Sequence, residues 1–454
     1  MAIIGAGVVG CAMARRFALE GARVAVIEAA PDILSGASKA NSAILHTGFD
    51  APPGSLELAC MQDGYREYME IRGAMNLPVL ETGAMVAAWT AEEEARLPAL
   101  LAQAHGNGVG DARIVTGAEA LEREPQIAPS VRAALLVPRE HLVDPWSAPL
   151  AYATQAKMLG ARFLFNAPLS AARREGGIWH LQAGDTALTA ASVVNCAGNQ
   201  GDRIEALLLG RSRFEIRPRK GQFVVFDKAS AALLRTILLP VPTERTKGVV
   251  LTRTIFGNLL VGPTAEEQED RERPEVTRPE LETLIAHAGR LVPGLAEMPV
   301  TAVYAGLRPA SDRKEYRVHA EPEQGYFCAG GIRSTGLTAA LGIARHVFGL
   351  WQGAGHAAAP PADPPVPVMP NLAEHLPRDW QAPGHDGIVC HCEMVTAREI
   401  RAALDSPLPP GDFGGLRRRT RCAMGRCQGF NCLARLSSMA DDRLSRPIAA
   451  EAGA

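Results

Sequence analysis

The chain opens with Ala2-Ile3-Ile4-Gly5-Ala6-Gly7-Val8-Val9-Gly10, and this stretch decides its fold. It has the pattern of an apolar strand, a glycine-rich turn and the start of a helix. Gly5 allows the tight turn, Gly7 lets the backbone approach a pyrophosphate, and Gly10 lets the helix pack closely on the strand. Because a helix N-terminus favours bound phosphate, the stretch predicts a dinucleotide site.

The following residues complete a βαβ unit. The helix is expected from Val8 to about Glu20, with Gly21 as its C-terminal stop. A second apolar strand, 23–27, leads to Glu28, eighteen residues after Gly10. A carboxylate at this spacing can bind ribose hydroxyls. Strand, glycines, helix, strand and acid all occur in order, which makes the motif more specific than its glycines alone.

Two later segments favour FAD over NAD. Residues 192–199 have the pattern of a buried strand ending in a small-residue turn, which is how flavoproteins of the glutathione-reductase type return to the nucleotide. Residues 328–338 form a second glycine-rich strand-to-helix turn, and a helix N-terminus there can stabilise negative charge on a reduced flavin. The chain contains one full fingerprint, so no separate NAD domain is expected.

Composition limits the function classes. The chain has 454 residues, of which 47% are hydrophobic and 21% charged, and this predicts two or three globular domains. Its formal charge of -2 gives no support to nucleic-acid binding. No apolar run is long enough to span a bilayer, although peripheral membrane association stays open. The apolar start lacks a preceding basic region, so a cytoplasmic location is expected rather than secretion.

The cysteines gather at the other end of the chain. Five of the nine lie in the last 65 residues, beginning with Cys390-His391-Cys392 and ending with the pair Cys427 and Cys432. Four thiolates converging from distant loops can hold an iron–sulfur cluster. Zinc is the main alternative, but Cys-x-Cys is less usual for structural zinc. The clustering indicates metal ligation in a reducing compartment and not a disulfide framework.

The segment around these cysteines has its own signals. Residues 353–383 are rich in Ala and Pro and predict an extended connector. Thr396 and Glu399 form a capping box for a short helix, 397–404. The basic run 416–421 can raise a cluster potential or dock an acidic partner, and a solvated basic face explains it equally well.

The expected fold class is α/β. A glutathione-reductase-type FAD-binding Rossmann domain is interleaved with an antiparallel-sheet substrate domain, and a small helical iron–sulfur domain follows. The predicted domains are FAD-binding 1–76, 143–213 and 304–352, substrate 77–142 and 214–303, linker 353–383, 2Fe–2S domain 384–440 and tail 441–454.

Four further stretches carry a family resemblance: Ala40 to Leu56, Leu142 to Trp146, Arg219 to Gln222, and Tyr304 to Pro309. With the nucleotide motif, they make residues 1–350 similar to D-amino-acid-oxidase-like flavoproteins, in the group of L-2-hydroxyglutarate dehydrogenases and the anaerobic glycerol-3-phosphate dehydrogenase large subunit. Residues 388–440 resemble the 2Fe–2S domain of bacterioferritin-associated ferredoxin.

The resemblance implies roles for individual residues. Arg308 would clamp a substrate carboxylate or phosphate, Arg333 would lie beside the flavin and the anionic group, and His46 would act as general base. The expected cofactor-binding residues are Gly5, Gly7, Gly10, Glu28, Asn41, Ser42, Ala197, Gly198, Gly331, Gly336, Leu337 and Thr338. The expected cluster ligands are Cys390, Cys392, Cys427 and Cys432, and Cys422 is left out because domains of this kind often lack a cysteine there.

One departure from the family pattern concerns the substrate. Glycerol-3-phosphate dehydrogenases typically carry Arg-Tyr four residues after the histidine, whereas this chain has Asp50 and Ala51. Because a carboxylate would repel a phosphate dianion, a small 2-hydroxy acid is favoured over glycerol 3-phosphate.

The sequence therefore predicts an FAD-dependent dehydrogenase for a small anionic hydroxy compound. Electrons would pass through a 2Fe–2S cluster to a quinone, an electron-transfer protein or a partner subunit, and we expect an oligomer or complex subunit. Oxidation of an amino acid or opine-like imino acid by the same site is one alternative. In another, the cysteine domain is a structural module for assembly.

Overall fold

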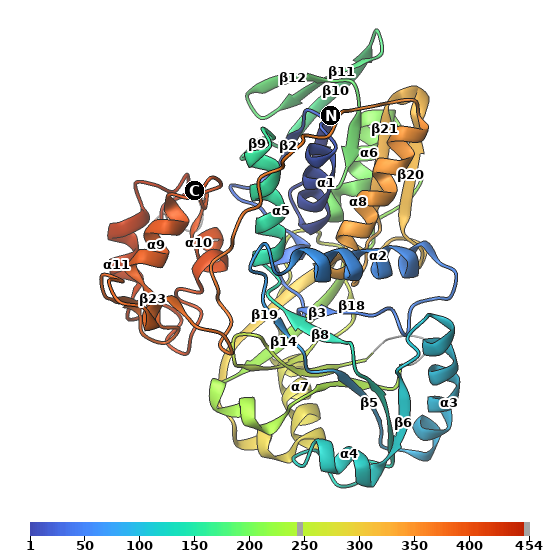
Figure 1. Ribbon diagram of the computed structural model, residues 1–454, viewed down its shortest axis with the longest axis vertical. Helices are drawn as coiled ribbons and strands as arrows, with labels where there is room; N and C mark the ends of the chain where they lie inside the picture. Colours follow the sequence, from blue (N-terminus) through green and yellow to red (C-terminus); the bar gives the residue numbers. More distant parts are fainter. Residues whose placement is uncertain (243–247, 449–454) are drawn as a thin grey trace.

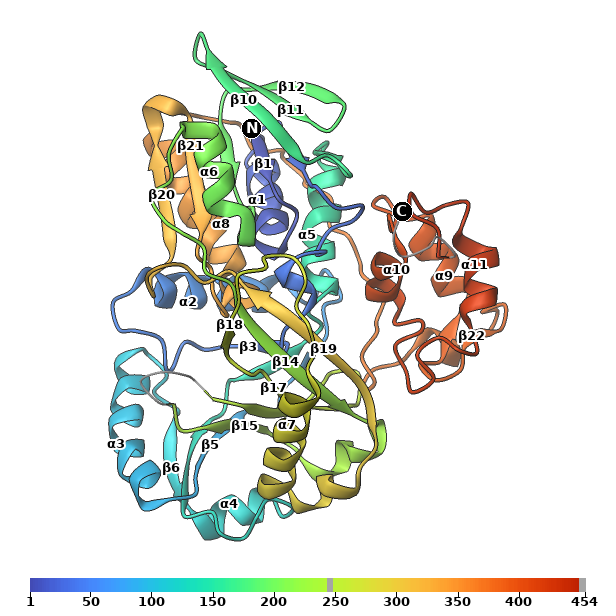
Figure 2. The same cartoon turned by 180° about the vertical axis from the view of Figure 1, so that it is seen from behind.

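The computed structural model describes residues 1–242 and 248–448, which form three parts (Figure 1). Residues 1–353 build a nucleotide domain and, below it in Figure 1, a roof domain. The first and the last helix of this segment both belong to the nucleotide domain. The cysteine domain (384–448) lies at one side of the other two parts. Figure 2 shows the same arrangement from behind, with α10 (Phe413–Thr420) of the cysteine domain turned toward the other two parts. No helix in the described ranges is both long and apolar enough to cross a membrane.

A six-stranded sheet forms the centre of the nucleotide domain. Its order is β20-β21-β13-β1-β2-β9, and all neighbours are parallel except β20 and β21. The strands are β1 (Ala2–Ile4), β2 (Ala25–Ile27), β9 (Arg162–Leu164), β13 (Val193–Asn195), β20 (Arg317–Glu321) and β21 (Tyr326–Gly330). The sheet confirms the predicted strand–helix–strand unit and its two later returns to the nucleotide.

Helices cover this sheet. They are α1 (Val8–Leu19), α2 (Leu56–Ile71), α5 (Ser147–Met158), α6 (Gly201–Leu209) and α8 (Gly336–Gly353). The helix α1 begins at the predicted residue and ends one residue before the predicted Glu20, and Gly21 has a positive φ of 86°. Phe17 packs edge-on against Phe348 and Trp351, with ring centroids 5.2 and 5.5 Å away. A small antiparallel sheet, β10 (Leu169–Glu175), β11 (Ile178–Ala183) and β12 (Thr186–Ala190), completes the domain.

The roof domain is a nine-stranded sheet. Its main order is β18-β14-β17-β16-β15-β5-β7-β6, with β19 also paired to β14. The strands are β5 (Ala84–Ala88), β6 (Arg113–Thr116), β7 (Ala133–Val137), β14 (Arg219–Phe226), β15 (Ile237–Pro240), β16 (Val250–Arg253), β17 (Leu259–Gly262), β18 (Glu266–Glu267) and β19 (Val300–Arg308). The pairs are antiparallel as predicted, except that β15 and β5 run parallel. Three helices flank the sheet: α3 (Ala91–Gly106), α4 (Gly117–Arg123) and α7 (Arg278–Leu291).

The two domains are interleaved, and they join at two places. A three-stranded sheet of β3 (Ile44–Leu45), β8 (His141–Val143) and β4 (Val79–Leu80) lies where the chain passes between them. The strand β19 pairs with β14 from Arg219 opposite Arg308 to Phe226 opposite Val300. The predicted boundary at residue 304 therefore falls inside a roof strand, which ends at Arg308.

The connector between the nucleotide and cysteine domains is extended and attached along its length. It runs beside α5 in Figure 1. The Gln155 amide donates to the Pro365 carbonyl at 2.8 Å, and the Asn76 amide donates to the Met369 carbonyl at 2.7 Å. Leu372 and Ala373 are buried against Ile255 and Phe256 of the roof. These contacts fix the path by which the chain reaches the cysteine domain.

The cysteine domain contains a hairpin and three short helices. They are β22 (Ile388–Cys390), β23 (Val395–Thr396), α9 (Ala397–Leu404), α10 (Phe413–Thr420) and α11 (Leu433–Ala440). The capping box predicted at Thr396 and Glu399 is present at the start of α9. Of the predicted tail, Leu444 is buried in this core and Ile448 packs against it, while residues 449–454 lie outside the described residues.

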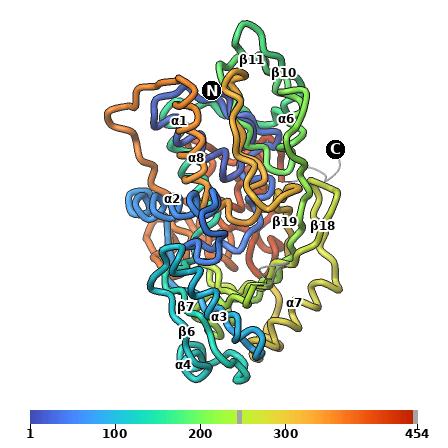
Figure 3. Tube along the Cα trace, turned by 90° about the vertical axis from the view of Figure 1, so that its right-hand side faces the viewer, coloured from blue at the N-terminus to red at the C-terminus, as the bar shows by residue number. Residues whose placement is uncertain are grey.

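The basic run 416–421 is not a solvated face, so that prediction is wrong. Arg418, Arg419 and Arg421 are only 8%, 5% and 6% exposed. They are buried because α10 faces the nucleotide and roof domains and not the solvent. The side view in Figure 3 shows the cysteine domain behind those two parts.

Candidate functional site

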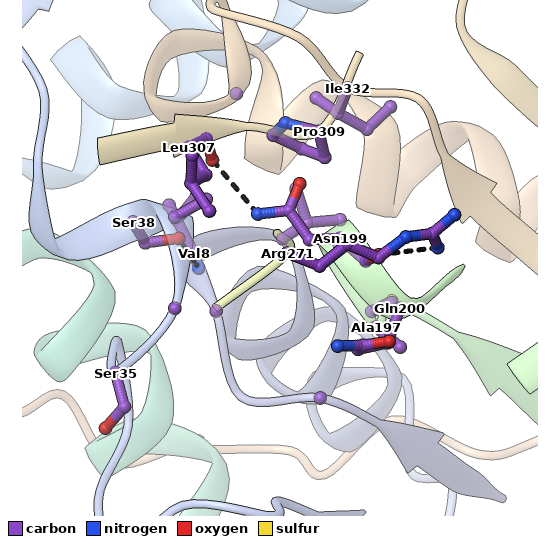
Figure 4. Close-up of a pocket in the computed structure, with 18 of the residues that line it drawn as sticks. Val8, Ser35, Ser38, Ala197, Asn199, Gln200, Arg271, Leu307, Pro309 and Ile332 are labelled. Carbon is purple, nitrogen blue, oxygen red and sulfur yellow. Dashed lines mark hydrogen bonds between the residues drawn. The ribbon is translucent and has the colours of Figure 1, made fainter. Parts of the chain in front are cut away.

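A cavity of about 800 Å³ lies between the carboxyl ends of the nucleotide strands and the roof sheet. Its lining runs from Gly5, Gly7 and Glu28 to Arg308 and Arg333. Figure 4 shows side chains from both domains around it. In open parallel sheets, ligands bind at this edge of the strands, so the cavity is the expected place for a dinucleotide.

The glycine turn is shaped by close backbone contacts. Gly5 has φ 98°, and a Cβ there would lie 2.6 Å from the Cys196 carbonyl oxygen. A Cβ on Gly10 would lie 1.9 Å from the Gly5 carbonyl oxygen. Gly10 therefore lets α1 pack on the turn and does not itself line the cavity. At the first turn of α1, the Val8 N–H donates to the Ser38 hydroxyl at 3.0 Å.

Glu28 stands at the end of β2, on the cavity wall. Its carboxylate accepts hydrogen bonds from the Ala6 N–H at 2.6 Å and the Ala30 N–H at 2.9 Å. Burial raises the pKa of this carboxyl above its ordinary value. The acid is therefore held beside the glycine turn, where it can accept hydrogen bonds from ribose hydroxyls, and the residues present fit FAD.

Most of the predicted cofactor residues meet at this cavity. Those that line it are Gly5, Gly7, Glu28, Asn41, Ser42, Ala197, Gly198, Gly331, Gly336 and Leu337. Thr338 does not line the cavity. Its hydroxyl instead accepts a hydrogen bond from the His46 N–H at 3.0 Å, which connects α8 to the segment after β3.

Two residues that line the cavity were not predicted, Asn199 of the nucleotide domain and Arg271 of the roof. The Asn199 amide donates to the Leu307 carbonyl at 3.2 Å, and the Arg271 guanidinium donates to the Asn199 carbonyl at 3.1 Å (Figure 4). Arg271 also pairs with Asp202 at the start of α6. In the sequence, Arg271 lies in a charged run that is typical of a surface loop, and nothing in the run marks it as a cavity residue.

Arg308 and Arg333 place positive charge at the other end of the cavity. Arg308 lies at the end of β19, and its Nη2 donates to the carbonyls of Lys220 at 2.9 Å and Thr264 at 2.6 Å. Burial and the nearby Arg219 and Arg333 lower the pKa of Arg308 to about 10. Neither Arg308 nor Arg333 forms an ion pair with another described residue. A bound anion would offset this excess of positive charge.

His46 follows β3, lies outside the residues that line the cavity, and is paired with a buried acid. Its Nδ1 lies 2.7 Å from Glu140 Oε2, and the His46 side chain is 25% exposed while the Glu140 side chain is fully buried. Glu140 also accepts the Thr47 N–H at 2.6 Å and the Thr47 hydroxyl at 2.7 Å. With three donors around it, the carboxylate is suited to hold a proton on Nδ1, which leaves Nε2 as the proton acceptor.

Sequence reasoning missed Glu140. It lies 94 residues from His46, in the turn between β7 and β8. The preceding Pro138-Arg139 gives this turn the composition of a solvent-exposed loop. The pairing of β3 with β8 brings the two residues together. The one feature of the sequence that could have pointed to Glu140 is the short apolar strand, 141–143, that directly follows it.

The four predicted cysteine ligands approach one another in two pairs. Cys392 and Cys427 are in side-chain contact, and so are Cys390 and Cys432. No three of these thiols have their sulfurs within 4.8 Å of one another, whereas such a group does occur at Glu205, His319 and Cys328 in the described ranges. A single tetrahedral zinc ion would need all four sulfurs within about 3.8 Å of one another.

The surroundings of the cysteines differ. Backbone N–H groups of Asn431, Gly429 and Phe430 lower the pKa of Cys427, and such a nest stabilises a thiolate. Burial raises the pKa of Cys422 to about 12, as it does for Cys432. Cys422 is buried beside Cys390 and Cys432 but contacts Thr420. It therefore stays outside the two contacting pairs.

The positions that departed from the family pattern, Asp50 and Ala51, do not line the cavity. Ala51 is fully buried, and its carbonyl accepts hydrogen bonds from the amides of Gln103 and Asn107, both at 2.9 Å. Like His46, Asp50 and Ala51 lie outside the lining residues, so a repulsion between Asp50 and a phosphate in the cavity would act through space and not through contact.

Comparison with known proteins identifies the family to which the chain is similar. Residues 1–350 match the sequence profile of the FAD dependent oxidoreductase family, DAO. A glycerol 3-phosphate dehydrogenase of Caloramator mitchellensis is 31% identical over 445 residues, which are 96% of this chain and 92% of that protein. An L-2-hydroxyglutarate dehydrogenase of Caenorhabditis elegans is 28% identical over 274 residues, 58% of this chain and 63% of that protein.

The fold has a counterpart among solved structures. An L-alpha-glycerophosphate oxidase of Mycoplasma pneumoniae, with FAD bound, superposes with a TM-score of 0.73 at 24% identity, covering 80% of this chain and 96% of its own. The Caloramator match extends through the cysteine domain, because it leaves only 4% of this chain uncovered.

Proposed function

The chain belongs to the FAD-dependent oxidoreductase family, and from this premise we propose that it is a dehydrogenase of a small anionic hydroxy compound. In this proposal the cavity holds FAD and substrate, and the cysteine domain passes electrons outward. The dehydrogenase assignment, as opposed to an oxidase, rests on the cysteine domain.

The observation that carries the proposal is the His46–Glu140 pair. Oxidation of an alcohol requires removal of the hydroxyl proton as hydride leaves the adjacent carbon. His46 Nε2 accepts that proton, and the Glu140 carboxylate stabilises the resulting imidazolium through the 2.7 Å contact at Nδ1. Bound FAD supplies the hydride acceptor.

The two arginines account for the negative charge of the substrate. Arg308 is fixed by three backbone carbonyls, Arg219 through Nε and Lys220 and Thr264 through Nη2, so its orientation does not depend on substrate. Its remaining Nη1 group, together with Arg333, suits a carboxylate or a phosphate. Such an anchor holds the hydroxyl-bearing carbon at a constant distance from the base, which lowers the entropic barrier of the reaction.

Two substrate classes compete for this site. A 2-hydroxy acid was favoured by Asp50 and Ala51, but neither residue lines the cavity. The near full-length relative is named a glycerol 3-phosphate dehydrogenase, and the shorter match is named for L-2-hydroxyglutarate. The proposal therefore commits to an anionic secondary alcohol, and the experiment below separates phosphate from carboxylate.

The arrangement of the cysteines supports a 2Fe–2S cluster over zinc. Two contacting pairs suit two irons, each with two thiolates, better than one tetrahedral ion. A cluster held there would carry single electrons. The Phe430 side chain beside it is 88% exposed, so the cysteine loop faces solvent, where a quinone or an electron-transfer protein can reach it.

The test is a visible and low-temperature EPR spectrum of anaerobically purified protein. Candidate substrates are added separately: glycerol 3-phosphate, L-2-hydroxyglutarate and other 2-hydroxy acids. Bleaching of the flavin followed by the signal of a reduced 2Fe–2S cluster is expected with one class. A flavin without iron, together with zinc in metal analysis, would overturn the electron-transfer role of the cysteine domain.

Amine oxidation is the alternative within the same site. Oxidation of a C–N bond needs no strong base, because a neutral amine carries no hydroxyl proton to remove. A His46→Ala variant that still reduces its flavin with amino or imino acids would favour that alternative. Loss of flavin reduction with hydroxy compounds alone would favour the proposed reaction.

A further inference from the structure

The cysteine domain contacts the nucleotide domain at a loop that also forms the cavity wall. We define this cavity loop as residues 29–36, which follow Glu28. Ala29, Ala30, Ser35 and Gly36 line the cavity. Between them, Asp32, Ile33 and Leu34 are at most 1% exposed and turn the other way. The loop is thus a thin wall with the dinucleotide site on one side and the cysteine domain on the other.

The charge of Asp32 is compensated from the cysteine domain. Arg419 donates to both carboxylate oxygens of Asp32, at 2.6 and 2.9 Å, in a bidentate pair. Arg418 donates to the Ile33 carbonyl at 3.0 Å. Both arginines are nine-tenths buried or more, so these contacts are shielded from solvent. Removing one partner of such a pair leaves an uncompensated buried charge.

The backbones also meet. A Cβ on Gly415, in the first turn of α10, would lie 1.6 Å from Asp32 Oδ2, and a Cβ on Gly411 would lie 1.7 Å from the Pro31 carbonyl oxygen. The helix α10 therefore rests on the loop at van der Waals distance. On the other side, the Leu34 N–H donates to the Ala6 carbonyl at 3.0 Å. The contacts thus run without a break from α10 to the glycine turn.

The position of α10 depends on the cysteine core. Leu416 of α10 is buried in one cluster with Cys390, Cys422 and Cys432. This core is small, and small domains with converging thiols commonly need their metal to fold. Arg419 is therefore held in place by a core that metal binding stabilises.

We propose that the cysteine domain has a second role, which is to retain the dinucleotide by holding the cavity loop. Filling of the cysteine site and binding of FAD then strengthen each other, since coupling between two sites is reciprocal. This inference rests on the proposed FAD and cysteine sites, but it requires neither a substrate nor electron transfer. Binding of an acidic partner was one role predicted for the basic run 416–421, and the acidic group that it binds is Asp32 of the same chain.

The first experiment compares two neighbouring glycines of α10 in the full-length holoenzyme. Gly415→Ala pushes the helix away from Asp32. Gly414→Ala has the same intrinsic effect on the helix, but its Cβ meets two side chains of the cysteine domain, Arg418 at 3.2 Å and the N-cap Asp412 at 3.3 Å, and no atom of the cavity loop. Release of FAD on dilution is followed by the rise of flavin fluorescence. We expect the FAD dissociation constant of Gly415→Ala to rise roughly 5- to 150-fold. That of Gly414→Ala should change much less, because the Arg418 and Asp412 side chains can move while the Asp32–Arg419 pair stays intact.

A second pair of variants removes charge instead of adding volume. Arg419→Gln breaks the pair with Asp32, and Arg426→Gln breaks another interdomain pair, with Asp227 of the roof at 2.9 Å. Only the first should weaken FAD binding. Arg419→Lys keeps the charge but loses the bidentate geometry, and an intermediate loss is expected, so the series stays informative if Arg419→Gln folds poorly.

The reciprocal measurement follows the metal. A chelator should extract metal from the wild-type protein faster after FAD has been removed, and this difference should vanish in Gly415→Ala. Equal FAD affinity in wild type, Gly415→Ala and Arg419→Gln would overturn the inference, and so would equal losses in both members of a pair. These measurements use no substrate, so a failure of the proposed reaction leaves them unaffected. If the variants keep the FAD affinity of the wild type and still reduce a cluster, the inferred coupling is wrong while the proposed electron transfer stands.

Discussion

At the residue scale, the proposed chemistry depends on a carboxylate that does not touch the substrate. In that proposal Glu140 is a positioning residue, because it contacts His46 Nδ1 and would act through it. In Glu140→Gln, the amide can donate to Nδ1 and so favours the tautomer with its proton on Nε2. We expect substrate-driven flavin reduction to slow by roughly 10²- to 10⁴-fold, with FAD content and melting temperature little changed.

A double-variant cycle separates this role from a structural one. If Glu140 acts only through the imidazole, His46→Ala/Glu140→Gln should reduce flavin no more slowly than His46→Ala. Additive losses, or a Glu140→Gln enzyme with the wild-type rate of flavin reduction, would remove Glu140 from the mechanism.

Glu28 makes FAD binding sensitive to acid. Burial raises the pKa of its carboxyl above the ordinary 4.5, so on acidification it gains a proton at a higher pH than an exposed glutamate. The ionised form accepts ribose hydroxyls better. FAD affinity should therefore be full above the raised pKa and fall as pH drops through it. Glu28→Gln should bind FAD more weakly at neutral pH and lose this pH dependence, which fluorescence titrations between pH 4 and 8 would measure. A pH dependence that Glu28→Gln retains would assign it to another group.

The residues that sequence could identify are those whose role is local. Gly5, Gly7 and Glu28 lie within one βαβ unit, and their spacing alone places them at the strand ends. Glu140 joins His46 only through the pairing of β3 with β8, which no periodicity encodes. Arg271 reaches the cavity for a similar reason, by way of the roof.

At the scale of elements, the cysteine loops can be tested against one another. Serine in place of Cys390, Cys392, Cys427 or Cys432 should abolish or strongly deplete the cluster, because each removes one thiolate ligand. Cys422→Ser is the matched control, since Cys422 is buried in the same core but contacts Thr420 and stays outside both cysteine pairs. Iron, zinc and acid-labile sulfide content and the EPR spectrum give the answer. Loss of metal in Cys422→Ser, with metal kept in Cys432→Ser, would exchange the two assignments.

Elements with strong periodicity or caps were predictable from sequence, whereas their partners were not. The helices α1 and α9 match their predicted ranges closely because a stop glycine or capping residues mark their ends. The basic run of α10 carries no sign of which surface it meets. Its burial depends on Asp32, 387 residues away from Arg419, and on glycines that allow close approach.

At the scale of the whole molecule, the proposed function divides the reaction between the two catalytic domains and the cysteine domain. The Mycoplasma oxidase, which superposes on 80% of this chain, shows that the fold of the two catalytic domains exists without a cysteine domain, because 96% of its own chain lies within the match. Deletion of residues 384–454 should therefore leave a folded flavoprotein. Its FAD affinity should be lower, since the cavity loop loses its support from α10.

The deletion variant also tests the route of the electrons. With saturating FAD, substrate should still reduce an artificial dye that takes electrons directly from the flavin. Reduction of a quinone or a protein acceptor should fall to near background, because these would receive electrons at the cysteine loop that carries the exposed Phe430. Steady-state assays with both acceptor types, and the mass in solution, distinguish the outcomes. If dye reduction persists while an oligomer dissociates and quinone reduction is unaffected, the cysteine domain serves assembly. If quinone reduction alone is lost and the mass per assembly changes only by the deleted residues, it serves electron transfer.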